Sequence, residues 1–396
     1  MFSTIEYFKK NFFLKLLILF LIISLMGLSV SLHYQTLVTF VLMPFLFFYI
    51  LIKNKHSVTF FKNTYLKTYS LIIYLSLILI FQSVDLQVAY NNIIQLSGVL
   101  LGSIIILEVL SFKKERLLSW LLLSFVVGYY VSIYFLSDSL DVEAKIDSQW
   151  IDRTGYHLNP NKYSYYSFIA NIAFFYLIEI TNKRIYKILS LITLSLGIYI
   201  SFLTASRSGL VFTGFIGVIY WMFIFDKFNK SFRIIKFIFT LCFILIVSKL
   251  VFETYSNSYL RNRVEQSSVN GDSRILIAEK ALNVFFDHPL TGVGPGQFSL
   301  YSSKYVYTHN SFLEAATNLG ILGLLLVGFL FFLPIFKTLK KRNFKISSLR
   351  LTSLLYFVFF MFYNFFYVFY WSVPEMMFFF LSIHLLKENL VIRNNQ

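Results

Sequence analysis

Residues 311–336 read SFLEAATNLGILGLLLVGFLFFLPIF, and this segment contains one charged side chain, Glu314. A helix needs about 20 apolar residues to cross a hydrocarbon layer of roughly 30 Å, so the segment is long enough to span a bilayer. Similar apolar runs recur between Leu14 and Leu386. Only helices and closed barrels satisfy their backbone hydrogen bonds in lipid, and these runs lack the alternation of barrel strands. The sequence therefore predicts an all-α polytopic membrane bundle.

The composition is typical of a chain whose main solvent is lipid, with 57% hydrophobic and 14% charged residues. About twelve transmembrane helices are predicted. Their expected ranges are 12–32, 36–52, 65–83, 91–111, 117–136, 163–180, 185–203, 208–226, 233–252, 311–336, 349–370 and 372–387. The whole chain, residues 1–396, is interpreted as a single integral membrane domain.

The net charge of +16 is explained by topology. With the amino terminus inside, 25 of the 35 lysines and arginines fall in cytoplasmic segments. One predicted outer loop, residues 137–162, gathers the acidic residues Asp138, Asp141, Glu143, Asp147 and Asp152. This is the positive-inside pattern, so both termini are predicted in the cytoplasm. No soluble basic domain exists to bind nucleic acid, which is therefore not expected as a partner.

A second outer segment, residues 253–310, is long enough to have its own structure. Asp272 or Ser273 can cap a helix that ends near Asp287, where His288-Pro289 follows. Its apolar residues lie broadly on one side at helical spacing: Ile275, Leu276, Leu282, Phe285 and Phe286. We expect an amphipathic helix that rests either on the outer membrane surface or on the bundle.

The sequence Gly292-Val293-Gly294-Pro295-Gly296 follows this helix. Glycines allow tight turns and a close approach of the backbone to a ligand. The cluster differs from a nucleotide-binding phosphate loop, because no Gly-Lys-Ser/Thr ending follows it.

Three polar residues are expected at the outer ends of separate spans, namely Arg207, Arg274 and His309. A guanidinium group binds phosphate oxygens in a bidentate manner, so the two arginines fit a pyrophosphate-linked ligand. Other readings remain open. Arg207 could anchor a helix end at the lipid head groups, Arg274 could pair with Asp272 or Glu279, and His309 could be an ordinary loop histidine.

His309 precedes a predicted helix start, where Asn310 or Ser311 can act as the cap. Ser311 and Glu314 have the spacing of a capping box. The positive end of the helix dipole would favour the neutral imidazole, which can accept a proton from a sugar hydroxyl.

Other kinds of site are less well supported. The outer acidic residues show no pairing of the kind that a glycosidase needs. His157, His288 and His309 share no metal-ligand spacing, so a bound metal is not expected. No predicted span carries a row of ionisable groups, which disfavours a transporter.

Several motifs, taken in order, resemble the O-antigen polymerase and O-antigen ligase superfamily. They are Gly155-Tyr156-His157-Leu158-Asn159-Pro160-Asn161, Thr204-Ala205-Ser206-Arg207-Ser208-Gly209, Ser273-Arg274 through Asp287-His288-Pro289-Leu290, Gly292 to Phe298, His309-Asn310-Ser311-Phe312-Leu313-Glu314 and Leu319-Gly320-Ile321-Leu322-Gly323. The long outer loop before the tenth span is also that family's layout. The first half of the chain matches only as hydrophobic spans.

The resemblance implies a glycosyltransferase that uses an undecaprenyl-pyrophosphate-linked oligosaccharide at the outer face of the bacterial cytoplasmic membrane. Arg207 and Arg274 would hold the pyrophosphate, and His309 would activate or orient the acceptor hydroxyl. Single in-line displacement would invert the anomeric carbon. Further substrate-binding positions implied by the motifs are Asn310, Ser206, Gly294, Gly296, Asn159 and Asn161.

Members of this superfamily differ in their acceptor. A polymerase of O antigen, capsule or exopolysaccharide is favoured here, because the chain lacks the extra outer domain of protein-glycosylating relatives. The alternatives are the ligase that transfers glycan to lipid A core, and a flippase or other transporter of polyprenyl-linked glycan. A chain-length regulator and a flippase of the same pathway are possible partners. The sugar, its linkage, the host's envelope type and the oligomeric state stay open.

Overall fold

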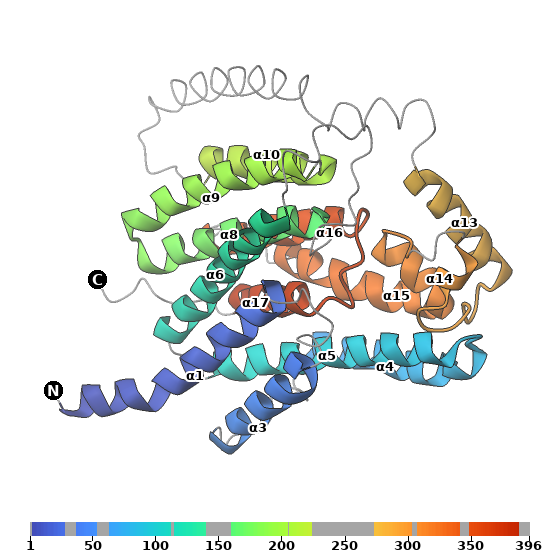
Figure 1. Ribbon diagram of the computed structural model, residues 1–396, viewed down its shortest axis with the longest axis horizontal. Helices are drawn as coiled ribbons and strands as arrows, with labels where there is room; N and C mark the ends of the chain where they lie inside the picture. The colour runs from blue at the N-terminus through green and yellow to red at the C-terminus, as the bar shows by residue number, and fades with distance from the viewer. Residues whose placement is uncertain are drawn as a thin grey trace. The chain divides into compact units, whose positions relative to one another are not determined.

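A computed structural model describes residues 2–27, 37–53, 63–111, 115–139, 160–204, 206–223, 273–302, 307–340 and 348–387. Every regular element among these residues is a helix, as predicted (Figure 1). In chain order they are α1 (Phe2–Met26), the π-helical turn η1 (Val38–Leu42), α3 (Met43–Lys53), α4 (Thr64–Leu79), the 3₁₀ turn η3 (Ile80–Gln82), α5 (Leu86–Ser111), α6 (Glu115–Ser139), α8 (Pro160–Thr181), α9 (Arg184–Leu203), α10 (Arg207–Phe223), α13 (Ser273–Asp287), α14 (Phe298–Tyr301), α15 (Ser311–Lys340), α16 (Ser348–Tyr363) and α17 (Val373–Lys387).

Five helical segments of the described chain are long and apolar enough to cross a membrane, by length and composition. They are Thr64–Gln82, Leu86–Ser111, Arg116–Phe135, Arg184–Ser201 and Ser311–Leu339. Shorter apolar helices occupy other predicted spans, at Phe12–Met26, Val38–Ile52, Ser208–Gly217, Leu349–Tyr363 and Val373–Leu386. Residues 233–252 and most of 137–162 lie outside the described part, so the total of about twelve spans stays a prediction.

The chain forms two compact units. Unit 1 combines Met1–Ser124 with Asp272–Gln396, and unit 2 is Phe125–Gly271. Helix α6 begins in the first and ends in the second. The expected single domain is not tested by this division.

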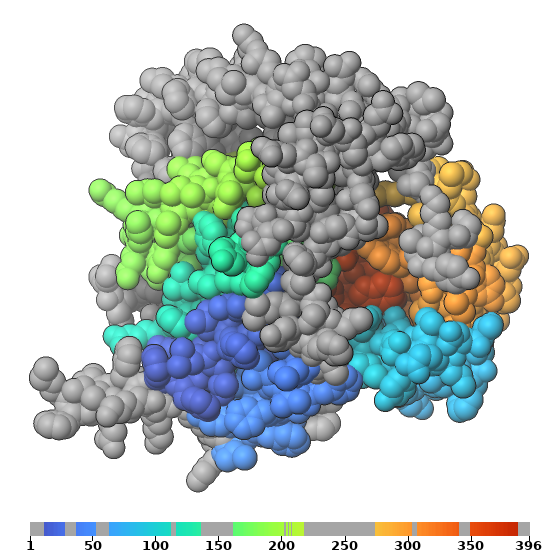
Figure 2. Space-filling model, in the orientation of Figure 1, coloured from blue at the N-terminus to red at the C-terminus, as the bar shows by residue number. Residues whose placement is uncertain are grey.

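Unit 1 is built around α5, which packs against α3, α4 and α17, while α15 packs against α4, α13 and α16 (Figure 1). Figure 2 shows the atoms of α4, in cyan, adjoining those of α13 to α15, in yellow to orange. Aromatic rings fill the core. The ring centroid of Phe331 lies 5.2 Å from that of Phe360 and 5.5 Å from that of Phe379. The Tyr69 phenol donates to the Tyr370 carbonyl oxygen at 2.5 Å, joining α4 to the segment before α17.

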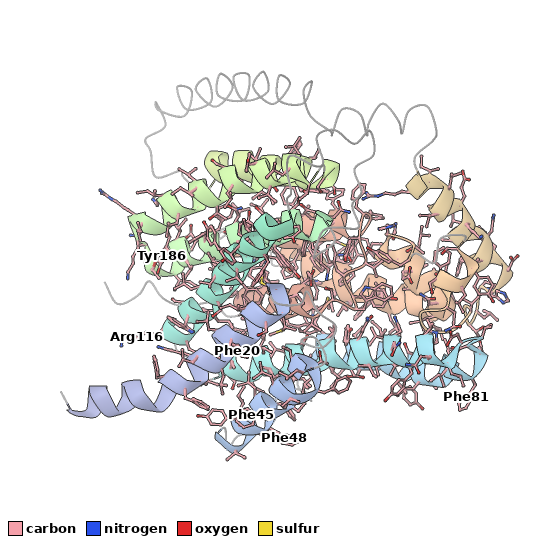
Figure 3. The ribbon with its side chains drawn as sticks, in the orientation of Figure 1. Phe20, Phe45, Phe48, Phe81, Arg116 and Tyr186 are labelled. Carbon is pink, nitrogen blue, oxygen red and sulfur yellow. The ribbon has the colours of Figure 1, made fainter. Side chains whose placement is uncertain are left out.

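Large apolar side chains cover the outside of unit 1. Phe20, Phe45 and Phe48 are each more than half exposed and point away from the helices that carry them (Figure 3). Phe81 is 90% exposed in η3, directly after α4, and Arg116 lies at the opposite end of the same unit (Figure 3). Exposed apolar side chains of this kind are suited to helices that face lipid.

The apolar segment after His309 folds differently from the single span predicted over 311–336. Gly320 has φ 67° and ψ −161°, which interrupts α15. The rings of Phe312 and Phe331 are 6.2 Å apart, whereas a straight helix would separate their positions by roughly 28 Å. The chain therefore reverses at Gly320, and residues 311–319 pack back along residues 321–340. The second part alone is about 30 Å long, enough to cross a bilayer.

Helix α13 confirms the helix expected over 273–287, and it carries apolar residues on two sides. Ala281 and Val284 are buried with Val293 and Phe298, so these residues face the bundle. The predicted apolar side is exposed instead, through Ile275, Leu276, Leu282 and Phe286. Apolar residues thus lie on both sides of the helix, and the exposed side is the one available to lipid.

Unit 2 packs α8, α9 and α10 through small residues. A Cβ atom on Gly197 would lie 1.9 Å from Ser167 Oγ, and one on Gly209 would lie 2.1 Å from Ser164 Oγ. Such contacts let helix backbones approach closely, as in membrane bundles. Helix α8 covers the span predicted at 163–180 and is buried along nearly its whole length.

Candidate functional site

His309 lies in the loop before α15 with φ 57°, in the left-handed region that non-glycine residues adopt at a cost. The next residue caps the helix: Asn310 Oδ1 accepts from the N–H groups of Phe312, at 2.9 Å, and Leu313, at 3.2 Å. Of the two residues expected to cap this helix, Asn310 is therefore the one that does so. It fixes the imidazole-bearing residue directly before a helix amino terminus.

A buried carboxylate, that of Glu314, holds this loop through a hydrogen bond to Thr308. Glu314 accepts the Thr308 N–H at Oε2 and the Asn318 Nδ2–H at Oε1, both at 2.7 Å. Asn318 is fixed in turn, because its Oδ1 accepts the Phe298 N–H at 2.9 Å. The predicted capping box of Ser311 with Glu314 is wrong, since Glu314 reaches past the helix start to the residue before His309.

Ser311 makes a different connection. Its N–H donates to the Asn364 carbonyl oxygen at 2.8 Å, and its hydroxyl donates to the Asn364 side chain. The same hydroxyl accepts the Phe369 N–H at 3.0 Å. These bonds are buried and join the loop of His309 to the connection between α16 and α17.

Aromatic rings surround the histidine. The Tyr307 ring centroid lies 4.3 Å from that of His309, 5.7 Å from Tyr367 and 5.9 Å from Trp371. The Tyr307 side chain also hydrogen-bonds Tyr367. Tyr307, His309, Tyr367 and Trp371 are half-buried, so one side of the group stays accessible.

The site lies deeper in unit 1 than the helix-end position expected for His309. Because Phe312 is level with Phe331, the loop stands about 15 Å along the helix that starts after Gly320. A Cβ on Gly98, near the middle of α5, would lie 3.7 Å from Val373, the first residue of α17. Irregular backbone is tolerated within a helical bundle where protein surrounds it.

The turn at residues 292–296, called here the glycine turn, is hydrogen-bonded to α15 just before Gly320 interrupts that helix. The Thr317 and Asn318 carbonyl oxygens, which a continuous helix would use itself, accept the N–H groups of Val293, at 2.9 Å, and Gly294, at 3.0 Å. Gly294 has φ 103°, and a Cβ there would lie 2.5 Å from Ser83 Oγ. The close approach that this glycine permits is therefore to protein.

Gly296 and Gln297 complete this contact. Gly296 has φ 73° and packs beside Asn92 and Val88 of α5. The buried Gln297 side chain accepts the Asp85 N–H and donates to the Asp85 carbonyl oxygen, each at 2.9 Å. The substrate-binding role expected for Gly294 and Gly296 stays a prediction.

In unit 2 two predicted substrate-binding residues meet. The buried Ser206 hydroxyl donates to Asn161 Oδ1 at 3.1 Å and accepts the Gly209 N–H at 3.3 Å. Ser206 thus caps α10, and Arg207 is the first residue of that helix. The side chain of Arg207 and all of Asn159 lie outside the described residues.

Arg274 is the second residue of α13, half-buried and engaged in an interaction within the protein. Of its two expected partners, Asp272 lies outside the described residues and Glu279 is exposed on α13. Arg274 and His309 belong to unit 1, and Arg207 belongs to unit 2. Among the described residues, no three His, Cys, Asp or Glu side chains gather as metal ligands do.

Sequence reasoning missed two parts of the site. Tyr307, Tyr367 and Trp371 were no more than aromatic residues among many, and no spacing marks them. Glu375 resembles an ordinary helix-start residue, three positions after Ser372. Its place near the start of an apolar helix was a usable signal, because ionisable groups are rare in apolar membrane helices and are often functional there.

Residues 191–328 match the family model described as O-Antigen ligase. The matched segment contains Arg207, Arg274 and His309, and it confirms the resemblance to the O-antigen polymerase and ligase superfamily. It supports a function of the ligase or polymerase type, and together with the apolar helices it indicates a multi-pass membrane protein. No curated protein matches the sequence.

Proposed function

We propose that this protein polymerises undecaprenyl-pyrophosphate-linked oligosaccharide repeat units into surface polysaccharide at the outer face of the bacterial cytoplasmic membrane. The observation that carries the proposal is the family match over 191–328, because this segment contains every residue assigned here to the chemistry. The loop of His309 supports it through its fixed cap, its strained backbone and its aromatic neighbours.

The reaction is a single displacement at the anomeric carbon. The acceptor hydroxyl oxygen forms the new glycosidic bond, the bond from the anomeric carbon to the diphosphate oxygen breaks, and the hydroxyl proton passes to His309. Negative charge grows on the departing diphosphate, so Arg207 and Arg274 stabilise the transition state electrostatically. A neutral His309 at the α15 amino terminus suits the role of general base.

The half-buried rings of Tyr307 and Trp371 provide flat apolar faces beside the proposed base. Aromatic rings of this kind can pack against the apolar face of a sugar, which would orient the acceptor hydroxyl toward His309.

A second candidate is the ligase, which the description of the matched family favours. It would use the same donor but transfer the glycan to lipid A core. The sequence has no extra outer domain between its hydrophobic segments, which disfavours a protein acceptor, so the acceptors to be separated by experiment are a second lipid-linked repeat unit and lipid A core. A glycan transporter also gains one supporting observation, since the carboxyl groups of Glu314 and Glu375 are buried within apolar helices.

Reconstitution of the purified protein with lipid-pyrophosphate-linked repeat units, followed by separation of the products by size, tests the proposal. A ladder of integral repeats supports the polymerase. A single transfer that requires added lipid A core supports the ligase. Movement of labelled donor across vesicles without any new glycosidic bond would support the transporter.

A further inference from the structure

The loop of His309 contains a hydroxyl group to which no role has been assigned so far, that of Thr308. This residue is buried, and it lies between two half-buried residues, Tyr307 and His309. The rings of these two neighbours pack together with their centroids 4.3 Å apart. The loop therefore presents Tyr307 and His309 on its accessible side, while Thr308 packs into the protein.

The Thr308 hydroxyl spans His309 and bonds the backbone on its far side. It donates to the Asn310 carbonyl oxygen at 2.8 Å, and it accepts the Asn310 N–H at 3.2 Å. The Asn310 nitrogen is bonded directly to the carbonyl carbon of His309. A hydrogen bond that fixes this nitrogen therefore restricts rotation of the His309 backbone, and with it the direction in which the imidazole leaves the chain.

The two residues that this hydroxyl joins are themselves fixed to the protein. The Thr308 N–H donates to Glu314 Oε2 at 2.7 Å, and the Glu314 side chain is buried. Asn310 is fixed because its side chain caps the first turn of α15. The backbone is thus anchored before and after His309, and the Thr308 hydroxyl is the direct link between the two anchors.

The ordinary explanation for such a threonine is a local turn, since threonine hydroxyls often bond the backbone two residues further along. A turn that only shaped the chain could carry glycine or asparagine at the enclosed position, because both adopt the left-handed conformation readily. Here the enclosed residue is His309 with φ 57°, a conformation that costs free energy for a histidine. The turn therefore holds a strained residue whose ring is the proposed base.

We propose that Thr308 is a positioning residue for His309. Its hydroxyl keeps His309 in the left-handed conformation, so that the imidazole stands beside the Tyr307 ring and faces the acceptor hydroxyl. This role rests on the proposed function, and it adds a residue to the three to which the chemistry is assigned. Thr308 itself takes no proton and touches no substrate.

Thr308→Val tests the hydroxyl, because valine has nearly the same shape and the Thr308 backbone N–H stays available to Glu314. The Asn310 N–H then loses its acceptor, while the Asn310 carbonyl oxygen keeps the Glu314 N–H at 2.9 Å. The reconstituted full chain is assayed for kcat and KM with lipid-linked repeat units. We expect kcat to fall roughly tenfold to a hundredfold, as misplacement of a reacting group does, while KM changes far less. Thr308→Ser, which keeps the hydroxyl, should restore most of the turnover.

The matched control is Thr338→Val, which removes another buried threonine hydroxyl of unit 1, one that donates to the Pro334 carbonyl oxygen at 2.7 Å. Melting temperatures in detergent are measured for both valine variants. A fall of kcat in Thr308→Val alone, at comparable melting temperatures, separates positioning from a general loosening of the protein. In the His309→Ala background Thr308→Val should reduce the residual transfer no further, because its effect passes through the histidine.

Wild-type kcat in Thr308→Val, equal losses of kcat in the two valine variants, or a further loss in the His309→Ala background would overturn the proposal. If His309→Ala forms no measurable product, the comparison of the two valine variants decides. If Thr308→Val fails to reach the membrane, Thr308→Ala takes its place, and normal kcat there contradicts the role. An active wild type with unaffected variants refutes this role alone, whereas a wild type that forms no glycosidic bond with any acceptor refutes the proposed function as well.

Discussion

The rings of Phe312 and Phe331 lie 6.2 Å apart although both belong to one apolar segment. This is possible only because the chain reverses at Gly320. The reversal brings the loop of His309 to the level of the aromatic core and frees the carbonyl oxygens that hold the glycine turn. One glycine thereby determines the position of two motifs.

Gly320→Ala should therefore destabilise the protein. Its φ and ψ lie in a region that is essentially confined to glycine, and a Cβ would lie 2.3 Å from the Leu290 carbonyl oxygen. We expect a loss of about 2–4 kcal/mol, measured as a lower melting temperature of the purified protein in detergent. Gly328→Ala is the control, because a Cβ there meets no atom within 4 Å. Equal melting temperatures of the two variants would contradict a required reversal.

The two hydrogen bonds that the Glu314 carboxylate accepts, from Thr308 and Asn318, give a second prediction. Glutamine at this position would turn an NH₂ group toward either the Thr308 N–H or the Asn318 amide, and Asn318 cannot rotate because Phe298 engages its oxygen. We expect Glu314→Gln to cost about 1–3 kcal/mol of stability and to reduce turnover. Thermal unfolding and the transfer assay check this against Asp287→Asn, an exposed carboxylate of α13. Unchanged stability and turnover in Glu314→Gln would contradict a structural role for the two hydrogen bonds that Glu314 accepts.

The two hydrogen bonds between the Gln297 side-chain amide and the Asp85 backbone give a third prediction. Truncation in Gln297→Ala leaves the Asp85 N–H without its acceptor, while the Asp85 carbonyl oxygen keeps the Ala89 N–H at 3.2 Å, so we expect a loss of about 1–3 kcal/mol. The exposed Gln87→Ala variant should stay within about 0.5 kcal/mol of wild type. Protease cleavage in the glycine turn provides an independent measurement, since a loosened turn should be cut faster.

Helix positions could be predicted closely from the sequence, because each apolar run is set by the thickness of the bilayer. The span predicted at 91–111 corresponds to the observed helix α5, Leu86–Ser111, and the span predicted at 185–203 corresponds to α9, Arg184–Leu203. The reversal was not predictable in the same way. Gly320, Gly323 and Gly328 lie in one apolar run, and hydrophobicity does not distinguish the glycine that breaks a helix from those that continue it.

The site was predicted in part for a similar reason. The cap by Asn310 is local and follows from residue type, whereas the bonds from Ser311 to Asn364 and Phe369 cross more than 50 residues. The role of Glu314 was misassigned because the capping-box spacing was present but the helix start used Asn310 instead. Contacts of this kind depend on tertiary packing, which spacing alone does not encode.

In unit 2 the pair formed by Ser206 and Asn161 should influence turnover through Arg207. Ser206→Ala removes the cap of α10 and should cost about 1 kcal/mol of helix stability, loosening the residue that follows. Both Ser206→Ala and Asn161→Ala should reduce turnover, and the two reductions should be of similar size. A double-mutant cycle on kcat/KM should give a coupling of about 0.5–1.5 kcal/mol, since the two side chains are hydrogen-bonded. Strictly multiplicative effects would indicate that each residue acts alone.

The arginines give the sharpest test of the proposed chemistry. Lysine keeps the positive charge but presents a point charge in place of a planar fork, so Arg207→Lys and Arg274→Lys should each lose about tenfold or more in kcat/KM if they bind diphosphate oxygens in a bidentate manner. An arginine that only anchors a helix end at the head groups would tolerate lysine, as we expect of the exposed Arg116→Lys. Near-normal turnover in either site variant would therefore favour the anchoring role for that residue. A loss in both, with a normal amount of protein in the membrane, would assign the diphosphate to the two guanidinium groups.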